Sequence, residues 1–262
     1  MVDGIAVAQG ATVAEPAVRK IGINDLFDAL GKGWRDFQAA PTQLIFLAVI
    51  YPVIGALAAR AAWGGDLMTL FFPLVSGFAL MGPILALGVY ELSRRREQGK
   101  EVSAFDALAV RHSAALPSIL VLGLVLVVLF IAWVVAARVI LHATLGSGAF
   151  AHPMDFLARV FGTSEGWELI IIGHTVGAIF ATIVLAVTVV SFPLLLDRNP
   201  GLGVAVRTSL RAVAANPVTM AIWGVIIAAL LIAGSATLFV GLAVAMPVLG
   251  HATWHLYRHV VV

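Results

Sequence analysis

The stretch PSILVLGLVLVVLFIAWVVAARVIL, residues Pro117–Leu141, decides the fold of this chain. A helix needs about 20 apolar residues to cross a bilayer, and this stretch exceeds that length with a single charged residue, Arg138, near its end. Comparable apolar blocks run about 41–59, 67–90, 167–195 and 217–257. The last block is roughly twice as long as one crossing, and the small residues 233–235 within it offer a place for the chain to reverse. The sequence therefore predicts six transmembrane helices.

The composition of the 262-residue chain is that of a membrane protein. Hydrophobic residues make up 61% and charged residues 11% of the chain, whereas an ordinary soluble domain carries roughly 25% charged residues. The lack of cysteine excludes disulfides, thiolate nucleophiles, iron–sulfur clusters and cysteine-ligated zinc. The net charge is +2, but the basic residues stand beside apolar spans and form no separate basic domain. Nucleic acid is therefore not an expected partner.

The distribution of basic residues predicts the orientation. With six spans both termini lie on one side, and that side carries thirteen of the sixteen lysines and arginines. The other side carries only Arg60, Arg138 and Arg159. The positive-inside rule then places both termini in the cytoplasm of a bacterial inner-membrane protein. Residues 1–20 lack the pattern of a signal peptide and are expected to form a flexible cytoplasmic tail, and residues 21–262 a single membrane domain.

The same arrangement recurs three times along the chain. The string FDAL occurs at 27–30 and again at 105–108. A proline opens each odd-numbered span and an arginine stands six residues before it; the pairs are Arg35 with Pro41, Arg111 with Pro117, and Arg211 with Pro217. The even-numbered spans carry internal prolines, Pro83, Pro193 and Pro247, which kink a helix and free backbone carbonyls. We therefore predict an all-α bundle of three repeats, about 21–97, 98–200 and 201–260, each with one cytoplasmic amphipathic helix and two spans.

The three amphipathic segments are expected to lie at the cytoplasmic interface. Their apolar faces would enter the headgroup boundary, and the repeated arginines would reach lipid phosphate and fix the threefold arrangement. Ser103 with Asp106 three residues later resembles a capping box that starts the second segment. A face that binds a protein partner is the alternative interpretation. Arg94–Arg96 are assigned to a solvated loop, and residues 153–161 to a smaller interfacial helix on the periplasmic side.

Ionisable residues avoid the centres of the predicted spans. Arg60, Glu91, Arg138 and Glu168 stand near span ends, where their side chains are expected to reach water. Buried ionisable residues usually mark a transport path or proton relay. The pattern therefore counts against an ion-coupled pump, while a passage for a small neutral or amphiphilic molecule stays open.

Histidines are the remaining candidates for a metal or haem site. His251, His255 and His259 recur every four residues and share one helical face. Two histidines four residues apart can chelate a metal. A haem would need a second histidine on another span at the same depth, and His174 does not meet this condition because it lies toward the periplasmic end of its span. His142, His152 and His174 form a further candidate group on the periplasmic side. Interfacial histidines bonded to carbonyls or lipid are the competing interpretation, and we expect no cofactor and no metal.

No motif of a catalytic site is present in the sequence. Gly173 and Gly177 form a GxxxG pattern, which permits a neighbouring helix to approach closely and is interpreted as packing. Metalloprotease, phosphate-loop and nucleophile-elbow motifs are missing. We therefore expect no catalytic residue, and a protein that is not an enzyme.

Three strings resemble a bacterial family of predicted integral membrane proteins, domain of unknown function 2189. They are VRKIGINDLFDALGKGWRDF at 18–37, PILALGVYELSRRREQGKEVSAFDAL at 83–108, and SFPLLLDRNPGLGVAVRTSLRAVAANP at 191–217. The resemblance covers about 18–258 and implies a multi-pass membrane protein without an established activity. Some members carry the label cytochrome c oxidase subunit I, which implies a much longer bundle with several buried haem-ligating histidines; this chain lacks them.

The leading hypothesis is a non-enzymatic inner-membrane protein with an accessory or assembly role. Its expected partners are membrane lipids and other inner-membrane proteins. A transporter or channel for a small neutral or amphiphilic molecule is the first alternative. A haem- or metal-binding membrane protein is the second.

Overall fold

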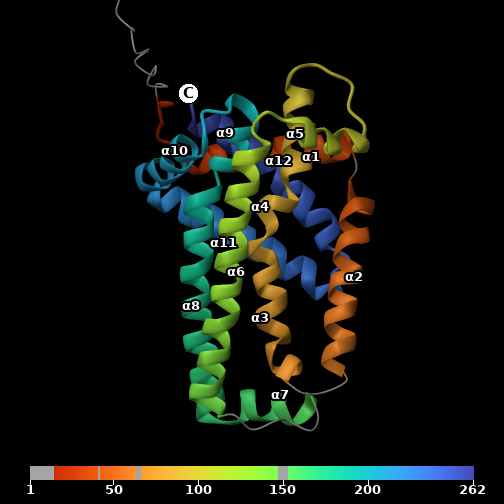
Figure 1. Cartoon of the computed structure of the whole chain (residues 1–262), viewed down its shortest axis with the longest axis vertical. Helices are drawn as coiled ribbons and strands as arrows, with labels where there is room; N and C mark the ends of the chain where they lie inside the picture. Colours follow the sequence, from red (N-terminus) through yellow and green to blue (C-terminus); the bar gives the residue numbers. More distant parts are fainter. Residues whose placement is uncertain (1–14, 41, 63–65, 147–152) are drawn as a thin grey trace, which may run out of the picture.

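The computed structural model describes residues 15–40, 42–62, 66–146 and 153–262, and within these ranges the protein is all-helical (Figure 1). The first half contains α1 (Ile23–Ala39), α2 (Gln43–Ala62), α3 (Asp66–Leu80), α4 (Gly82–Leu85), α5 (Leu87–Glu97), the 3₁₀ helix η1 (Ala104–His112) and α6 (Leu116–Leu145). The second half contains α7 (Pro153–Gly162), α8 (Ser164–Thr188), α9 (Ser191–Arg198), α10 (Leu202–Ala215), α11 (Pro217–Ala236) and α12 (Leu242–Val260). In these ranges the β pairing is a single bridge between Val18 and Val261.

Among the residues that the structure describes, three helical segments are long and apolar enough to cross a membrane. They are α6, the continuous stretch of α8 and α9, and α11; shorter apolar stretches occupy 45–57 in α2 and 69–80 in α3. α6 packs on α8 and α3, and α3 packs on α2, so that these helices run side by side along the long axis (Figure 1). An outward-facing stripe on α6 consists of Leu120, Leu124, Val128, Ile131, Val135 and Val139, each more than half exposed. A stripe of this length and spacing is a lipid-facing surface.

Each predicted apolar block contains helix, but three details differ from the predicted spans. The predicted span at 167–195 is divided into α8 and α9. The predicted span at 67–90 is broken into α3, α4 and α5, with Pro83 at the start of α4. The reversal predicted at 233–235 lies instead between Ala236 and Leu242, where Leu238 and Phe239 have left-handed φ angles of 52° and 66°. The predicted position of the reversal was wrong because small residues permit a turn but do not require one, and α11 continues through residues 233–235.

The break between α8 and α9 is closed by hydroxyl groups. Ser209 of α10 accepts from the Val190 backbone N–H at 3.2 Å and donates to the Ala186 carbonyl at 2.7 Å. Ser191 donates to the Ala205 carbonyl at 3.2 Å. The backbone groups that the break frees are therefore satisfied by a neighbouring helix, as is required inside a membrane protein.

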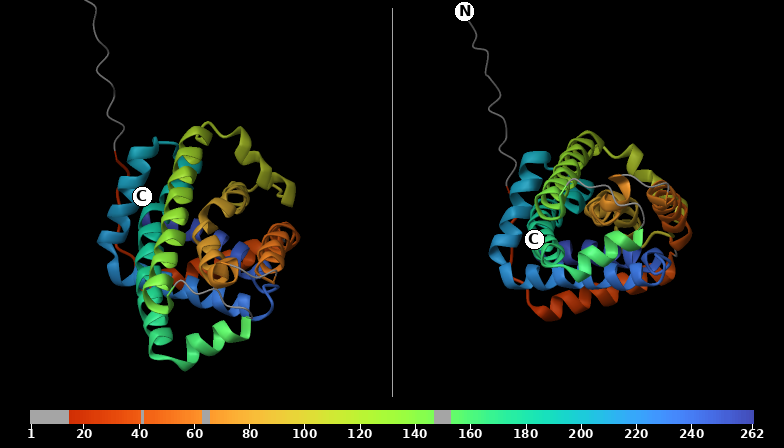
Figure 2. Two further views of the ribbon diagram at one scale, coloured as in Figure 1. Left: turned by 60° about the horizontal axis from the view of Figure 1, so that its bottom comes forward. Right: turned by 90° about the horizontal axis from the view of Figure 1, so that it is seen from below.

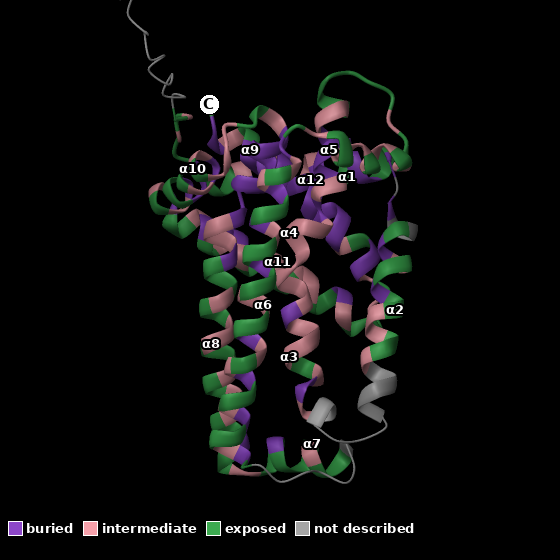
Figure 3. Cartoon of the chain, in the orientation of Figure 1, coloured by how far each residue is buried: buried purple, intermediate pink, exposed green. Residues whose placement is uncertain are grey.

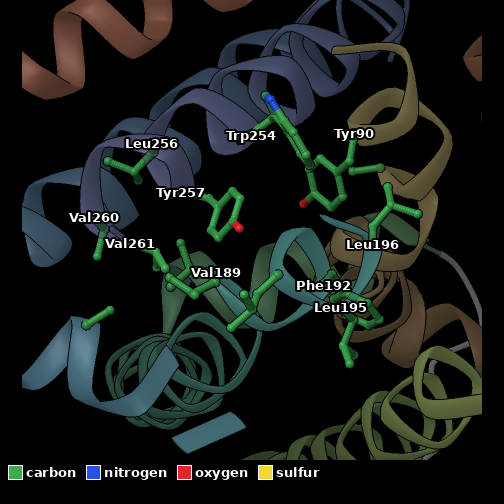
Figure 4. Packing of buried hydrophobic residues seen from close by; sticks show 14 of the residues in the cluster. Tyr90, Val189, Phe192, Leu195, Leu196, Trp254, Leu256, Tyr257, Val260 and Val261 are labelled. Atoms are coloured by element: carbon green, nitrogen blue, oxygen red, sulfur yellow. The ribbon is translucent and has the colours of Figure 1, made fainter. Parts of the chain in front are cut away.

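Buried residues concentrate at one end of the molecule (Figure 3). We call this the polar end; it is formed by α1, α5, η1, α9, α10 and the C-terminal half of α12. Trp254 and Tyr257 of α12 are fully buried there and pack in one cluster with Phe192 and Leu195 of α9 and Tyr90 of α5 (Figure 4). The main core therefore holds the polar end together and extends into the apolar helices, where Leu126 of α6 and Trp223 of α11 are fully buried.

The amphipathic segments take different forms. α1 lies across the bundle, and Figure 2 (right) shows it from the side while α2 and α3 are seen nearly end on. The segment expected as a second amphipathic α-helix is the 3₁₀ helix η1, and its capping box is confirmed because the Ser103 N–H donates to Asp106 at 2.9 Å. At the opposite end α7 exposes Met154, Leu157 and Phe161 along one face.

Candidate functional site

The helices α1 and α12 bring together the groups that define the polar end. They run antiparallel, because Asp28 of α1 contacts His259 of α12 whereas Asp36 contacts His255. Gly33 permits the close approach: a Cβ atom there would lie 2.6 Å from the backbone nitrogen of Ala252. Residues separated by more than two hundred positions thus form one interface.

The Asp36 carboxylate is the centre of the first cluster. Ser93 Oγ donates to its Oδ2 at 2.7 Å and His255 Nε2 donates to the same oxygen at 2.8 Å. Arg96 Nε lies 3.1 Å from Oδ1. Burial would raise the pKa of this carboxyl, but the hydrogen bonds from His255 and Ser93 outweigh burial and hold the pKa below its usual value. A charged carboxylate therefore joins α1, α5 and α12.

His251 extends this cluster into the interior. Its side chain is 1% exposed, and its Nδ1 lies 2.7 Å from Ser93 Oγ. Because the Ser93 hydroxyl proton is donated to Asp36, Ser93 Oγ accepts from His251 Nδ1–H. The lone pair is then on His251 Nε2, which is buried and has no hydrogen-bond partner among the described residues.

A second cluster surrounds Glu91, whose side chain is 3% exposed. Arg94 Nε donates to its Oε2 at 2.8 Å and Arg95 Nε to its Oε1 at 2.7 Å. Arg95 also donates to Asp106 of η1 at 2.7 Å. Two expectations from the sequence are therefore wrong: Glu91 does not reach water, and Arg94–Arg96 lie in the last turn of α5, bound to carboxylates. The helix α5 extends through Glu97, and the carboxylate of Glu91 is buried on it.

A third cluster joins α9, α12 and the end of α5. Tyr257 donates to Asp197 at 2.6 Å, and Trp254 Nε1 donates to Glu97 at 3.2 Å. Arg258 bridges the two carboxylates, with Nε 3.0 Å from Glu97 and NH1 3.4 Å from Asp197. The three clusters are separate, and each contains residues of α5: Ser93 and Arg96 in the first, Glu91 in the second and Glu97 in the third.

A pocket of about 440 Å³ lies beside the second cluster, between α5, η1, the start of α6 and α9. Its charged and imidazole-bearing lining residues are Glu91, Arg94, Arg95, His112, Asp197 and Arg198. The three residues directly before α6, Ser113, Ala114 and Ala115, complete its wall. The pocket therefore combines arginine side chains with the positive end of a long helix dipole.

The predicted metal candidates are separated in the structure. His251 and His255 belong to the Asp36 cluster, and His251 is buried rather than interfacial. His174 lies on the exposed surface of α8, where its Nδ1 is 2.7 Å from the Ile170 carbonyl oxygen. His142 is in the last turn of α6, and His152 is outside the described residues. Across the described ranges, no three histidine or acidic side chains are placed to hold a metal ion.

The residues of the predicted repeat occupy unlike environments. Arg35, Arg111 and Arg211 are all exposed, and Arg211 NH1 pairs with Glu15 at 2.8 Å. Pro41 is outside the described residues. Pro83 and Pro193 stand just after helix breaks, and Pro247 lies inside the unbroken α12.

The GxxxG pattern contributes one contact. A Cβ at Gly177 would lie 3.2 Å from the Trp133 ring of α6, whereas a Cβ at Gly173 would meet nothing within 4 Å. Contacts closer than that of Gly177 include two at the polar end, where Gly33 faces Ala252 and Gly88 faces Ala107 at 2.8 Å. These two glycines were not predicted from the sequence.

Asp36, Ser93 and Asp197 were not predicted from the sequence either. For Asp36, the pattern of residues along α1 could have indicated its burial. The spacing of Leu26, Ala29, Gly33 and Asp36 follows one helical face, and these four residues are the buried ones on that side of α1. An acidic residue that continues an apolar face indicates a buried partner.

The apolar α6, α8–α9 and α11 define a helical membrane protein with several membrane-length segments. Residues 71–197, from α3 to α9, match the family described as Predicted integral membrane protein (DUF2189), and it is to this family that the region belongs. The match confirms the resemblance inferred from the sequence. The comparisons with curated proteins and with solved structures gave no match.

Proposed function

We propose that this protein is a six-span inner-membrane protein with cytoplasmic termini that acts through lipid and protein partners, in an accessory or assembly role. Its three units would be α1 to α5, η1 to α9, and α10 to α12. In support, each unit begins with a short segment at the polar end and continues with two helices or broken helices. The arginine asymmetry favours a cytoplasmic polar end.

The burial of α12 explains why it can be a span without being strongly apolar. This helix packs against α1, α2, α5 and α11, and nearly all of its surface in the C-terminal half is covered. A helix shielded from lipid by other helices can carry polar residues that face the bundle interior. The hydropathy of α12 therefore does not count against a sixth crossing.

The observation that carries the proposal is the exposed apolar surface of the short segments. Phe105 of η1 is 84% exposed, and Phe27 of α1 and Leu108 of η1 are 63% and 60% exposed. Leu210 of α10 is 45% exposed. Their opposite sides pack on the ends of longer helices. Apolar side chains on a firmly docked polar end fit the headgroup boundary of a bilayer better than water.

Reporter fusions test the topology. Fusions after Lys100 and after Val262 are expected to report cytoplasm, and a fusion after Gly162 is expected to report periplasm. A cytoplasmic report at Gly162 would contradict the six-span arrangement, since α7 would then lie on the same side as the termini.

The interfacial placement is tested by site-specific labelling, for which a chain without cysteine is well suited. A fluorophore attached at Phe105→Cys is expected to be quenched by spin-labelled lipid, and one at Glu101→Cys, three residues from η1, by a water-soluble quencher. Equal quenching by the aqueous agent at both positions would refute placement of η1 in the headgroup boundary. Co-purification of lipid and protein partners from native membrane then identifies what the polar end binds.

A further inference from the structure

The pocket between α5, η1, α6 and α9 has the chemistry of a phosphate site. Three guanidinium groups, on Arg94, Arg95 and Arg198, line it together with two carboxylates, on Glu91 and Asp197. Asp106 binds Arg95 and offsets the third guanidinium, so an anion would be held by unused N–H donors and not by an excess of positive charge. Arginine is the side chain whose planar fork best fits a phosphate group.

The carboxylates hold the arginines without using all their donors. Arg94 binds Glu91 through Nε and NH2, at 2.8 Å and 3.1 Å. Arg95 uses Nε for Glu91 and NH1 for Asp106. Since a guanidinium has five N–H donors, each group keeps N–H bonds for a further acceptor. Fixed arginines with remaining donors are pre-organised for an anion.

The third arginine is held from the other side of the pocket. Arg198 NH1 donates to the Val262 carbonyl at 3.1 Å, and its Nε lies 3.5 Å from Asp197. Its side chain is 37% exposed, compared with 29% for Arg94 and 27% for Arg95. Partly desolvated guanidinium groups bind an anion more strongly than fully exposed ones.

The N-terminal end of α6 adds the positive end of a helix dipole to the pocket, and the helix leads from the pocket to an apolar surface. Ala115, the residue before the helix, lies in the pocket wall, and its N–H donates to Ser113 Oγ at 3.2 Å. The positive end of a 30-residue helix therefore faces the same space. The helix then continues into the lipid-facing stripe that begins at Leu120, and η1 exposes Phe105 and Leu108 on the other side.

We propose that this pocket binds the phosphate headgroup of an anionic phospholipid. The apolar surfaces of α6 and η1 would accept its acyl chains, which favours a lipid over a free phosphate. Basic pockets between helix ends at the cytoplasmic surface commonly bind anionic headgroups. The lipid assignment rests on the proposed placement of the polar end at the membrane interface.

The test uses the full chain purified in detergent. The melting temperature is measured at increasing concentrations of phosphatidylglycerol, and in parallel with phosphatidylcholine and with inorganic phosphate. We expect phosphatidylglycerol to raise the melting temperature at lower concentration than either of the others. Arg198→Gln is expected to weaken this effect about tenfold, the loss of one charge-assisted hydrogen bond.

Arg207→Gln is the matched control, because it removes the same charge at the same end and Arg207 pairs with Glu15 outside the pocket. It is expected to change the response less than about twofold, in line with an exposed charge. Arg94→Lys is a second variant, which keeps the charge beside Glu91 but removes the fork, and it should also weaken the response. The melting temperature without lipid reports whether each variant folds.

Equal responses to phosphatidylglycerol and phosphatidylcholine, or equal losses in Arg198→Gln and Arg207→Gln, would overturn the proposal. Protection by inorganic phosphate that matches phosphatidylglycerol would replace the lipid with a soluble phosphate ligand. These results do not depend on orientation in the membrane. If the lipid titration fails while the reporter fusions match six spans, only the pocket proposal is contradicted. If the fusions contradict six spans while the lipid titration succeeds, only the proposed topology is contradicted.

Discussion

Ser93 connects a buried carboxylate and a buried imidazole through two hydrogen bonds. Its hydroxyl donates to Asp36 and accepts from His251, both at 2.7 Å. Neither neighbour can replace these bonds with water, because Asp36 is 7% exposed and His251 1% exposed. Removing a single oxygen therefore leaves two buried groups short of a partner.

Ser93→Ala is expected to lower the free energy of unfolding by about 1–3 kcal/mol. Thermal melting of the purified chain in detergent measures the loss. Ser235→Ala is the control, because Ser235 Oγ donates only to the Leu231 carbonyl of its own helix at 2.8 Å. Equal melting temperatures for the two variants would show that the hydrogen bonds of Ser93 to Asp36 and His251 do not contribute to stability.

The Asp36 carboxylate makes the docking of α1 sensitive to acid. Its pKa in the folded protein is lowered, against burial, by His255 and Ser93, while His251 and Arg96 also face it. A carboxyl with a lowered folded pKa contributes stability above its unfolded pKa, about 3.9, and loses that stability as the pH falls through the folded value.

Between about pH 5 and pH 3, the wild-type chain is therefore expected to lose more stability than Asp36→Asn. At neutral pH the wild-type chain is expected to be the more stable of the two. Hydrogen exchange of the α1 amides across this pH range measures the effect. Parallel pH curves for the two proteins would contradict the assignment to Asp36.

At the scale of elements, two glycines of α1 predict opposite outcomes. A Cβ at Gly33 would lie 2.6 Å from the Ala252 backbone nitrogen, whereas the nearest atom to a Cβ at Gly31 is Arg35 NH1 at 3.7 Å. Gly33→Ala is expected to cost about 1–3 kcal/mol by overpacking the α1–α12 interface. Gly31→Ala is expected to stabilise the helix by up to about 1 kcal/mol. Melting curves that shift in the same direction would refute the close approach of α1 and α12.

The arginines of α5 and η1 give a further comparison between elements. Arg95 bridges Glu91 and Asp106, whereas Arg111 is exposed. Arg95→Ala is therefore expected to lower stability by at least about 1 kcal/mol, because it weakens the pairing of a buried carboxylate. Arg111→Ala should change stability by less than about 0.5 kcal/mol. This order reverses the expectation from the sequence, and a larger loss for Arg111→Ala would restore the repeated arginines as structural anchors.

For the whole molecule, apolar runs predicted the positions of α6, α8 and α11 because a membrane-length helix is a local property of the chain. The capping box at Ser103 was predictable for the same reason. The Asp36 cluster was not, because its groups come from residues 36, 93, 96, 251 and 255 and meet only through tertiary packing. The histidine spacing on α12 correctly indicated one shared face, but it could not indicate that α1 covers that face with aspartates.

The pairing of the two chain ends has a consequence for biosynthesis. α1 leaves the ribosome before α12 and before Val261, which forms a β bridge with Val18. Until α12 is made, α1 lacks the helix that it contacts most extensively, although Ser93 and Arg96 of α5 are already available to Asp36. A chain truncated after Thr237 is expected to insert its earlier spans and yet leave α1 open to protease from the cytoplasmic side. We therefore expect the polar end to form only after α12 has been synthesised.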